Sequence, residues 1–237
     1  MCGRYTHLYT WQELHLLMRL ATASDAELEQ FRKRYNVAPQ QQAPVVIQQG
    51  DERRAAFFRW GLIPSWSNDE SFAAKTINAR AETVATSPAF RGPFRQRRCI
   101  VPISGFYEWQ ALEGRKHRQP WYIRGAAEPI LLLAGLWDAW APGSGEPLRT
   151  FTVLTTEPNA VMRPLHTRMP VILPQDGWES WLDPGSPVEV LQGLLKPCNA
   201  ARLQTRPVGT KVNAVAYDAP DCVLESRLKD EQPGLFG

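Results

Sequence analysis

The sequence predicts an α+β fold, a single domain in which a mostly antiparallel β-sheet forms the core and several helices flank it. Two observations support this prediction. Short strand-like runs recur along most of the chain, whereas the longer helical patterns are confined to one segment near each end. The composition is 43% hydrophobic over 237 residues, which is sufficient for a sizeable buried core.

A strand-like segment opens the chain, and capping boxes mark two helices after it. In residues 10–13 and 24–27, a threonine or serine is followed three residues later by glutamate, a spacing that satisfies backbone N–H groups at a helix start. Apolar residues then recur at helical spacing, so both helices are expected to lie against the domain. The side chains expected to face inward are Trp11, Leu14, Leu17, Met18, Leu28 and Phe31.

A loop and a hairpin are expected next. Residues 34–39 contain asparagine and proline, which favour a loop. Strand-like runs at 44–49 and 53–60 flank a Gly-Asp pair at 50–51, which is typical of a hairpin turn.

Two further segments carry polar or aromatic side chains outside the expected core. Residues 60–66 hold two tryptophans around glycine and proline, a composition that suits an exposed aromatic loop. Residues 76–83, if extended, would present Asn78, Arg80 and Glu82 on one face, because side chains alternate along a strand.

The second half of the chain is expected to complete the sheet. Residues 131–136 are apolar throughout, which favours a buried central strand. A short helix is expected to begin near Thr156, and prolines bound a loop at 164–170. The remaining expected elements are strands at 97–103, 105–110, 121–124, 149–155, 171–173 and 203–208, and helices at 177–182 and 188–195.

Charge and aromatic content agree with nucleic-acid binding without establishing it. The net charge of +3 is too small to identify a polyanionic partner. Arginine supplies 21 of the 27 basic residues, and its planar fork suits phosphate and base stacking, although a GC-rich genome would produce the same bias. Several of the nine tryptophans lie beside arginine or glycine in expected loops, where base stacking is a natural use.

The four cysteines, Cys2, Cys99, Cys198 and Cys222, are scattered along the chain without a C-x-x-C spacing. This pattern favours neither a zinc site nor a disulfide framework, so all except Cys2 are expected to be buried thiols. No apolar run approaches the roughly 18 residues of a membrane span, and the start of the chain lacks the layout of a signal peptide. We therefore expect a cytoplasmic protein.

Cys2 becomes a 1,2-aminothiol if Met1 is removed. The unperturbed pKa of an α-amine is about 7.7–8.0 and that of a thiol about 8.5, so both groups are partly nucleophilic near neutral pH. An aldehyde would condense with the amine to an imine, on which the sulfur closes to give a thiazolidine. This stretch alone favours an ordinary second residue, so the rest of the chain must supply activating neighbours for Cys2.

Three residues in separate motifs are candidate activators. Glu108 lies between large aromatic residues, where loss of solvent would raise its pKa and suit it to proton transfer, unless it faces solvent from a strand. His166 titrates near neutral pH but is also a common type of surface residue. Asn78 could hold a carbonyl or hydroxyl, or only cap a turn.

An ordered set of motifs contains these candidates and closely resembles the SRAP family, the SOS-response-associated peptidases that process abasic sites. The motifs are MCGRY at 1–5, RYNVAP at 34–39, WGLIPSW at 60–66, INARAET at 77–83, GFYEW at 105–109 and LHTRMP at 165–170, and VGTKVN at 208–213 is similar to the closing motif. The resemblance covers roughly residues 1–225. It implies the SRAP fold with a barrel-like core in a domain at 1–228. Residues 229–237 are mostly polar and contain glycine and proline, so this tail is expected to be disordered.

By this resemblance, Cys2 would form a thiazolidine with the aldehyde of an abasic deoxyribose in single-stranded DNA. Asn78 would hold the sugar oxygen, Glu108 and His166 would transfer protons, and β-elimination would give AP-lyase activity. Removal of Met1 would be autocatalytic or left to an aminopeptidase. The expected DNA-binding residues are Arg4, Asn36, Pro39, Trp66, Arg80, Trp109, Thr155 and Arg168. Neither a cofactor nor a metal is expected, and the protein should act as a monomer, associated with the nucleoid when it is bound to DNA.

Two other functions remain open at this point. Cys2 could serve an N-terminal-nucleophile amidase or peptidase, in which its own amine is the base for the thiol. Alternatively, the arginines and tryptophans could form a non-catalytic module that binds single strands reversibly.

Overall fold

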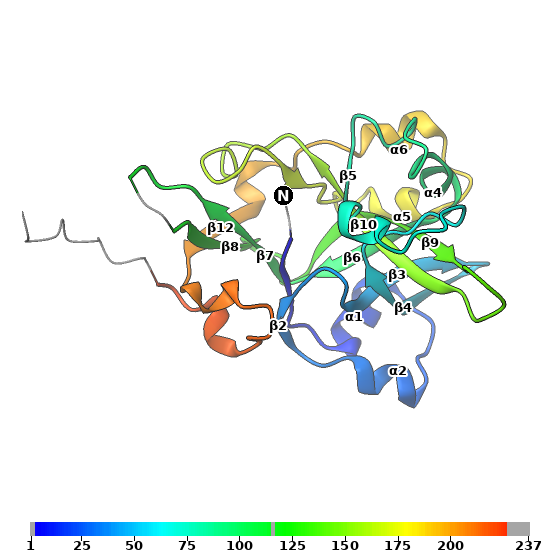
Figure 1. Cartoon of the computed structure of the whole chain (residues 1–237), viewed down its shortest axis with the longest axis horizontal. Coiled ribbons are helices and arrows are strands. Elements are labelled where there is room, and N and C mark those ends of the chain that lie inside the picture. The colour runs from blue at the N-terminus through cyan, green and yellow to red at the C-terminus, as the bar shows by residue number, and fades with distance from the viewer. Residues whose placement is uncertain (1–2, 115–116, 227–237) are drawn as a thin grey trace, which may run out of the picture.

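The structure is a computed structural model that describes residues 3–114 and 117–226, and five strands form a closed barrel at its centre (Figure 1). Strand β3 pairs with β4 and β6, β9 pairs with β6 and β10, and the parallel pairing of β10 with β4 completes the ring. The barrel strands are β3 (Gln42–Gln49), β4 (Glu52–Trp60), β6 (Arg98–Ile103), β9 (Leu131–Trp140) and β10 (Leu148–Thr156).

Two short strands lie along the end of β10. Strand β5 (Asn78–Arg80) runs parallel to β10, and β11 (Met169–Pro170) runs antiparallel to it. Both registers meet at Thr155, which lies opposite Arg80 on one side and Pro170 on the other. Segments distant in the sequence are therefore brought together at this end of the barrel.

A second, fully antiparallel sheet lies beside the barrel in the order β12-β8-β7-β1-β2. Strand β1 occupies an inner position, so the beginning of the described chain is held between two neighbours. Apolar side chains of this sheet, including Tyr5, Phe106 and Ile123, share one buried cluster with the barrel interior. The strands are β1 (Tyr5–His7), β2 (Arg34–Val37), β7 (Gly105–Gln110), β8 (Gln119–Gly125) and β12 (Leu203–Pro207).

Short helices surround the barrel, with α1 and α2 on one side and α4, α5 and α6 on the other (Figure 1). The helices are α1 (Trp11–Met18), α2 (Asp25–Gln30), α3 (Phe72–Lys75), α4 (Arg91–Gln96), α5 (Trp178–Leu182) and α6 (Val188–Gly193), with 3-10 turns η1 (Ala200–Arg202), η2 (Thr210–Asn213) and η3 (Pro220–Val223). Within the described residues, no helix has the length and apolar character needed to cross a membrane.

The predicted fold class is confirmed, because antiparallel pairings predominate and the helices are peripheral. Both capping boxes are present, at Thr10 and Ser24. The hairpin at 50–51 is also confirmed: Gln49 pairs with Glu52, and Gly50 adopts a φ of 58° that favours glycine. The three cysteines other than Cys2 are free and buried, as expected.

Two segments differ from the sequence prediction near residues 34 and 156. Residues 34–37 form β2 instead of a loop, because they pair with β1 and the proline falls after the strand has ended. The helix expected near Thr156 is absent: Asn159 accepts the Met162 N–H through its side chain, and turns follow up to residue 165.

Several inward-facing positions and boundaries were also wrong. Leu17 and Leu28 are 39% and 36% exposed, because only narrow faces of α1 and α2 contact the domain. Within the aromatic loop, Trp60 is fully buried, whereas Trp66 is 58% exposed. The strand expected at 171–173 is displaced: β11 ends at Pro170, and a single bridge from Ile172 to Leu133 follows it.

Candidate functional site

Glu108 is a buried carboxyl on β7. Because side chains alternate along a strand, Glu108 shares the face of Phe106, which packs in the barrel cluster, while Tyr107 and Trp109 take the opposite face. Only 2% of Glu108 is exposed, and burial raises the pKa of its carboxyl to about 7. Near neutral pH, this group is therefore present in both protonation states, as a proton-transfer residue requires.

The beginning of the described chain runs directly beside Glu108. In the β1–β7 pairing, Tyr5 lies opposite Phe106, and the Tyr107 N–H donates to the Arg4 carbonyl at 3.0 Å. Continuing this antiparallel register by two residues from the Tyr5–Phe106 pair brings Gly3 level with Glu108. Cys2, the predicted nucleophile, lies outside the described residues.

His166 lies in the segment between β10 and β11 and is half-buried. Its Nδ1 accepts the Arg168 N–H at 2.9 Å, so in the neutral ring the proton is on Nε2. Partial burial lowers the pKa of His166 below its ordinary value, and the positive charges of Arg118 and Arg168 act in the same direction. At neutral pH, His166 is therefore an uncharged imidazole with an N–H that can donate.

A hydrogen bond joins the His166 segment to the end of β7. The Gln110 amide donates to the Pro164 carbonyl at 3.2 Å, and the Gln110 side-chain oxygen accepts the Trp121 indole N–H at 2.9 Å. Since Gln110 follows Glu108 by two residues, these contacts place the histidine segment against the strand that carries the buried carboxyl.

A second group of predicted residues meets where β5, β10 and β11 pair, and we call this group the barrel edge: Asn78, Arg80, Glu82, Thr155 and Arg168. Asn78 is half-buried opposite Val153, and Thr155 is fully buried. Arg80 is exposed, and Glu82 lies in the turn after β5 instead of extending the strand as expected. Arg168 binds the Glu82 carboxylate with both terminal nitrogens, at 2.6 and 2.8 Å.

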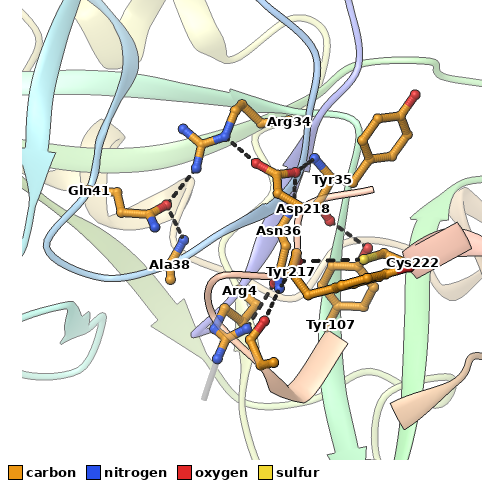
Figure 2. A network of polar contacts seen from close by, with 11 residues as sticks. Arg4, Arg34, Tyr35, Asn36, Ala38, Gln41, Tyr107, Tyr217, Asp218 and Cys222 are labelled. Carbon is orange, nitrogen blue, oxygen red and sulfur yellow. Dashed lines mark hydrogen bonds and ion pairs between the residues drawn. The ribbon is translucent and has the colours of Figure 1, made fainter. Parts of the chain in front are cut away.

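Arg4 and Asn36 belong to a third group, in which they hold residues 212–218 (Figure 2). Trp109 joins this group through its contact with Asn213. The Arg4 guanidinium donates to the Asn36 side-chain oxygen and the Val212 carbonyl, both at 2.8 Å, and to the Asn213 carbonyl at 3.2 Å. It also lies 6.0 Å from the Trp109 ring centre, and the Trp109 indole N–H donates to the Asn213 side chain at 2.7 Å. We call this group the buried clamp.

Asn36 is the centre of the buried clamp and has no exposed surface. Its amide nitrogen donates to the carbonyls of Val212, Ala214 and Tyr217. Asp218 completes the group by binding the Arg34 side chain and accepting the backbone N–H groups of Tyr35 and Asn36. Asn36 is thus occupied with the protein itself, and its predicted contact with DNA remains a prediction.

The remaining predicted DNA-binding residues lie apart from these groups. Trp66 packs edge-on against Phe72 at 5.7 Å, near the start of β10, whereas the barrel edge is at the other end of that strand. Asp138 anchors the tryptophan loop by accepting the Ser65 N–H at 3.0 Å. Pro39 is half-buried in the turn after β2.

Sequence reasoning missed two contributors, Asp218 and the Glu82–Arg168 pair. Glu82 had been grouped with Arg80 by alternation, but nothing in the sequence indicated its partner in a loop 86 residues away. Asp218 carries no local signal, since its partners come from β2. In the described ranges, no group of three or more histidine, cysteine, aspartate or glutamate side chains is arranged to hold a metal ion.

The chain is similar in sequence to a family model and to several known proteins. A family model described as SOS response associated peptidase (SRAP) matches residues 1–215. The abasic site processing protein YoaM of Bacillus subtilis is 38% identical over 221 residues, which is 90% of this chain and 93% of YoaM. The abasic site processing protein HMCES of Gallus gallus is 33% identical, with coverage of 84% of this chain and 68% of HMCES.

A solved structure shares the fold. A Bacteroides thetaiotaomicron protein has a TM-score of 0.81 and 28% sequence identity, and the match covers 94% of this chain and 99% of that protein. The two proteins therefore share one overall fold.

Proposed function

This chain belongs to the SRAP family, and on that premise we propose that it processes abasic sites in single-stranded DNA by forming a covalent thiazolidine cross-link through Cys2. The relatives named above are described as abasic site processing proteins. The observation that carries the proposal is Glu108, a buried carboxyl with a pKa of about 7, on the strand beside the start of the described chain.

The proposed reaction begins once Met1 has been hydrolysed away, which consumes one water and leaves the Cys2 amine free. The abasic sugar opens when a base removes the proton of the anomeric hydroxyl and an acid protonates the ring oxygen. The amine then adds to C1′ and one water leaves, giving the imine. The Cys2 sulfur bonds to C1′, the thiol proton passes to the imine nitrogen, and the thiazolidine is complete.

The described residues supply the groups that these steps need. Protonated Glu108 donates to a departing oxygen and, once ionised, takes a proton back, because its pKa lies near the working pH. His166 offers an Nε2–H, since its Nδ1 is already engaged. Asn78 is proposed to hold the sugar oxygen. The imine also acidifies the C2′ proton, so loss of that proton with cleavage of the C3′–O bond gives AP-lyase activity.

The proposal also covers the contacts with DNA, the oligomeric state and the cellular location. Arg80 and Arg168 contact phosphates, and Trp66 stacks on a base. Residues 1–228 act as one monomeric domain on DNA in the cytoplasm, without a cofactor.

Intact-protein mass spectrometry with a defined oligonucleotide tests this function. The native protein should lack Met1, and incubation with a single strand that contains one abasic site should give a species equal to the two masses less one water. A strand without the lesion is the control and should give no adduct. An amidase would react with neither strand, and a non-catalytic module would bind both reversibly.

Two variants separate the aminothiol from other chemistry. Cys2→Ala keeps the amine but has no sulfur, so at most an imine should form, and a reducing agent would be needed to trap it. A residue retained ahead of Cys2 blocks the amine and should abolish the adduct. An equally fast and durable adduct from the blocked protein would refute the proposed mechanism.

A further inference from the structure

The Arg168 guanidinium is held on two sides at the barrel edge. Its terminal nitrogens bind the Glu82 carboxylate at 2.6 and 2.8 Å, and one of them also donates to the Thr155 carbonyl at 2.6 Å. The Arg168 side chain is 18% exposed, whereas that of Glu82 is 52% exposed. Arg168 thus has two partners: the backbone carbonyl of Thr155 and the solvent-accessible carboxylate of Glu82.

The backbone partner keeps Arg168 in place without Glu82. Thr155 belongs to β10, and its carbonyl also accepts the Ala81 N–H at 2.9 Å, so the oxygen is fixed by the pairing of β10 with the β5 segment. Glu82 lies in a turn, and a half-exposed ion pair of this kind contributes little to stability because water screens it. The carboxylate can therefore leave while the guanidinium keeps its position.

A phosphate could bind the Arg168 guanidinium at the position that the Glu82 carboxylate occupies. A guanidinium binds carboxylate and phosphate with the same two-pronged geometry. Arg80, two residues before Glu82 and exposed, also acts on this carboxylate, since its charge and that of Arg168 both help to lower the Glu82 pKa, after the hydrogen bonds from Arg168. An anion in this position is therefore near two arginines.

We propose that Glu82 occupies the position of a DNA phosphate at Arg168 and is exchanged for that phosphate when a single strand binds. This inference rests on the proposed function and adds a specificity element to it. Glu82 competes with every strand, so binding through Arg168 alone is weak, and stable binding depends on the other contacts and on the covalent step.

Glu82→Gln tests the exchange, because the amide keeps the size of the side chain but not its charge. We expect the variant to bind an intact single strand roughly two- to fivefold more tightly at low salt, and the log–log salt slope to steepen by about 0.7. Glu157→Gln is the matched control: it removes the same charge from an exposed residue close to Thr156, and it should change both quantities less.

A double-mutant cycle with Arg168→Ala identifies the partner. In the Arg168→Ala background, Glu82→Gln should no longer improve binding, because the arginine that it frees is absent. Unchanged or weaker binding by Glu82→Gln would overturn the exchange. An equal gain from Glu157→Gln, or a gain that persists without Arg168, would also overturn it by showing that only the overall charge matters.

Failure of this inference is distinguishable from failure of the proposed function. The adduct assay on the wild-type protein reports on the proposed function alone. If the wild-type protein cross-links the abasic strand and Glu82→Gln binds no better, the exchange is wrong and the abasic-site function stands.

Discussion

The buried clamp and the barrel edge use the same residue type in opposite ways. In the clamp, Arg4 has three hydrogen bonds to protein oxygens, and burial lowers the pKa of its guanidinium. At the edge, Arg80 is exposed, and the main partner of Arg168 is a solvent-accessible carboxylate. An arginine within a family motif can thus donate to backbone carbonyls of its own chain or pair with a solvent-accessible carboxylate, and the type of partner distinguishes the two arrangements.

The largest expected effect tests the structural side of this comparison. Asn36→Ala removes the donor shared by three carbonyls and the acceptor of Arg4, and should lower the free energy of unfolding by about 2–4 kcal/mol, measured by urea denaturation. Gln192→Ala, at an exposed amide on α6, should stay within about 0.5 kcal/mol. Near-normal stability of Asn36→Ala would show that the clamp is not structural.

The next effect concerns Glu108, which is about as buried as Asn36 of the clamp but is proposed to take part in the reaction. Its folded pKa of about 7 lies above the ordinary 4.5, so the folded state binds this proton more tightly than the unfolded state. The resulting stability is complete below pH 4.5 and is lost as the pH rises through 7. Glu108→Gln does not titrate, so its stability relative to wild type should increase between pH 4 and pH 8, by at most roughly 3 kcal/mol.

Thermal or urea unfolding at both pH values measures that difference, and Glu189→Gln on the surface of α6 should show none. Adduct formation by Glu108→Gln should slow while its DNA affinity stays close to wild type. A flat pH difference would mean that the carboxyl is solvated in the folded protein.

The smallest effect separates the two kinds of arginine directly. Arg80→Ala should leave stability within about 0.5 kcal/mol and reduce the salt slope of single-strand binding by roughly 0.7, one phosphate's worth. Arg4→Ala should instead destabilise the fold, because carbonyls of residues 212 and 213 lose their donor. Binding titrations over a range of salt concentrations, paired with melting curves, give both readings. If Arg80→Ala destabilised the fold and Arg4→Ala changed only the salt slope, the clamp would be the DNA-binding region and the barrel edge the structural one.

Local rules predicted the local elements of the fold. The capping boxes, the hairpin at 50–51 and the apolar run at 131–136 each depend on a few neighbouring residues, and all three are present. The closure of the barrel was not predictable in the same way, because the parallel pairing of β10 with β4 joins strands about 90 residues apart. Strand β2 was missed for the same reason, since its pairing with β1 outweighs its loop-like composition.

The candidate site likewise contains some features that neighbouring residues predict and others that depend on distant segments. The predicted rise in the pKa of Glu108 agrees with the structure, but its aromatic neighbours lie on the opposite face of β7, and burial on the face of Phe106 is the cause. The partners of Arg4, Asn36 and Arg168 come from segments remote in the sequence, so no pattern around those residues could show that they were engaged. Whether the edge and loop residues contact DNA stays a prediction.

The clamp also has a consequence for synthesis of the protein. Arg4 and Val212 are 208 residues apart, and at a translation rate of roughly 5–20 residues per second the second is made about 10–40 s after the first. During that interval, Arg4, which directly precedes β1, lacks the carbonyls that fix its side chain. A chain interrupted before residue 212 would therefore lack the carbonyls that hold Arg4, and the segment before β1 would be without this anchor.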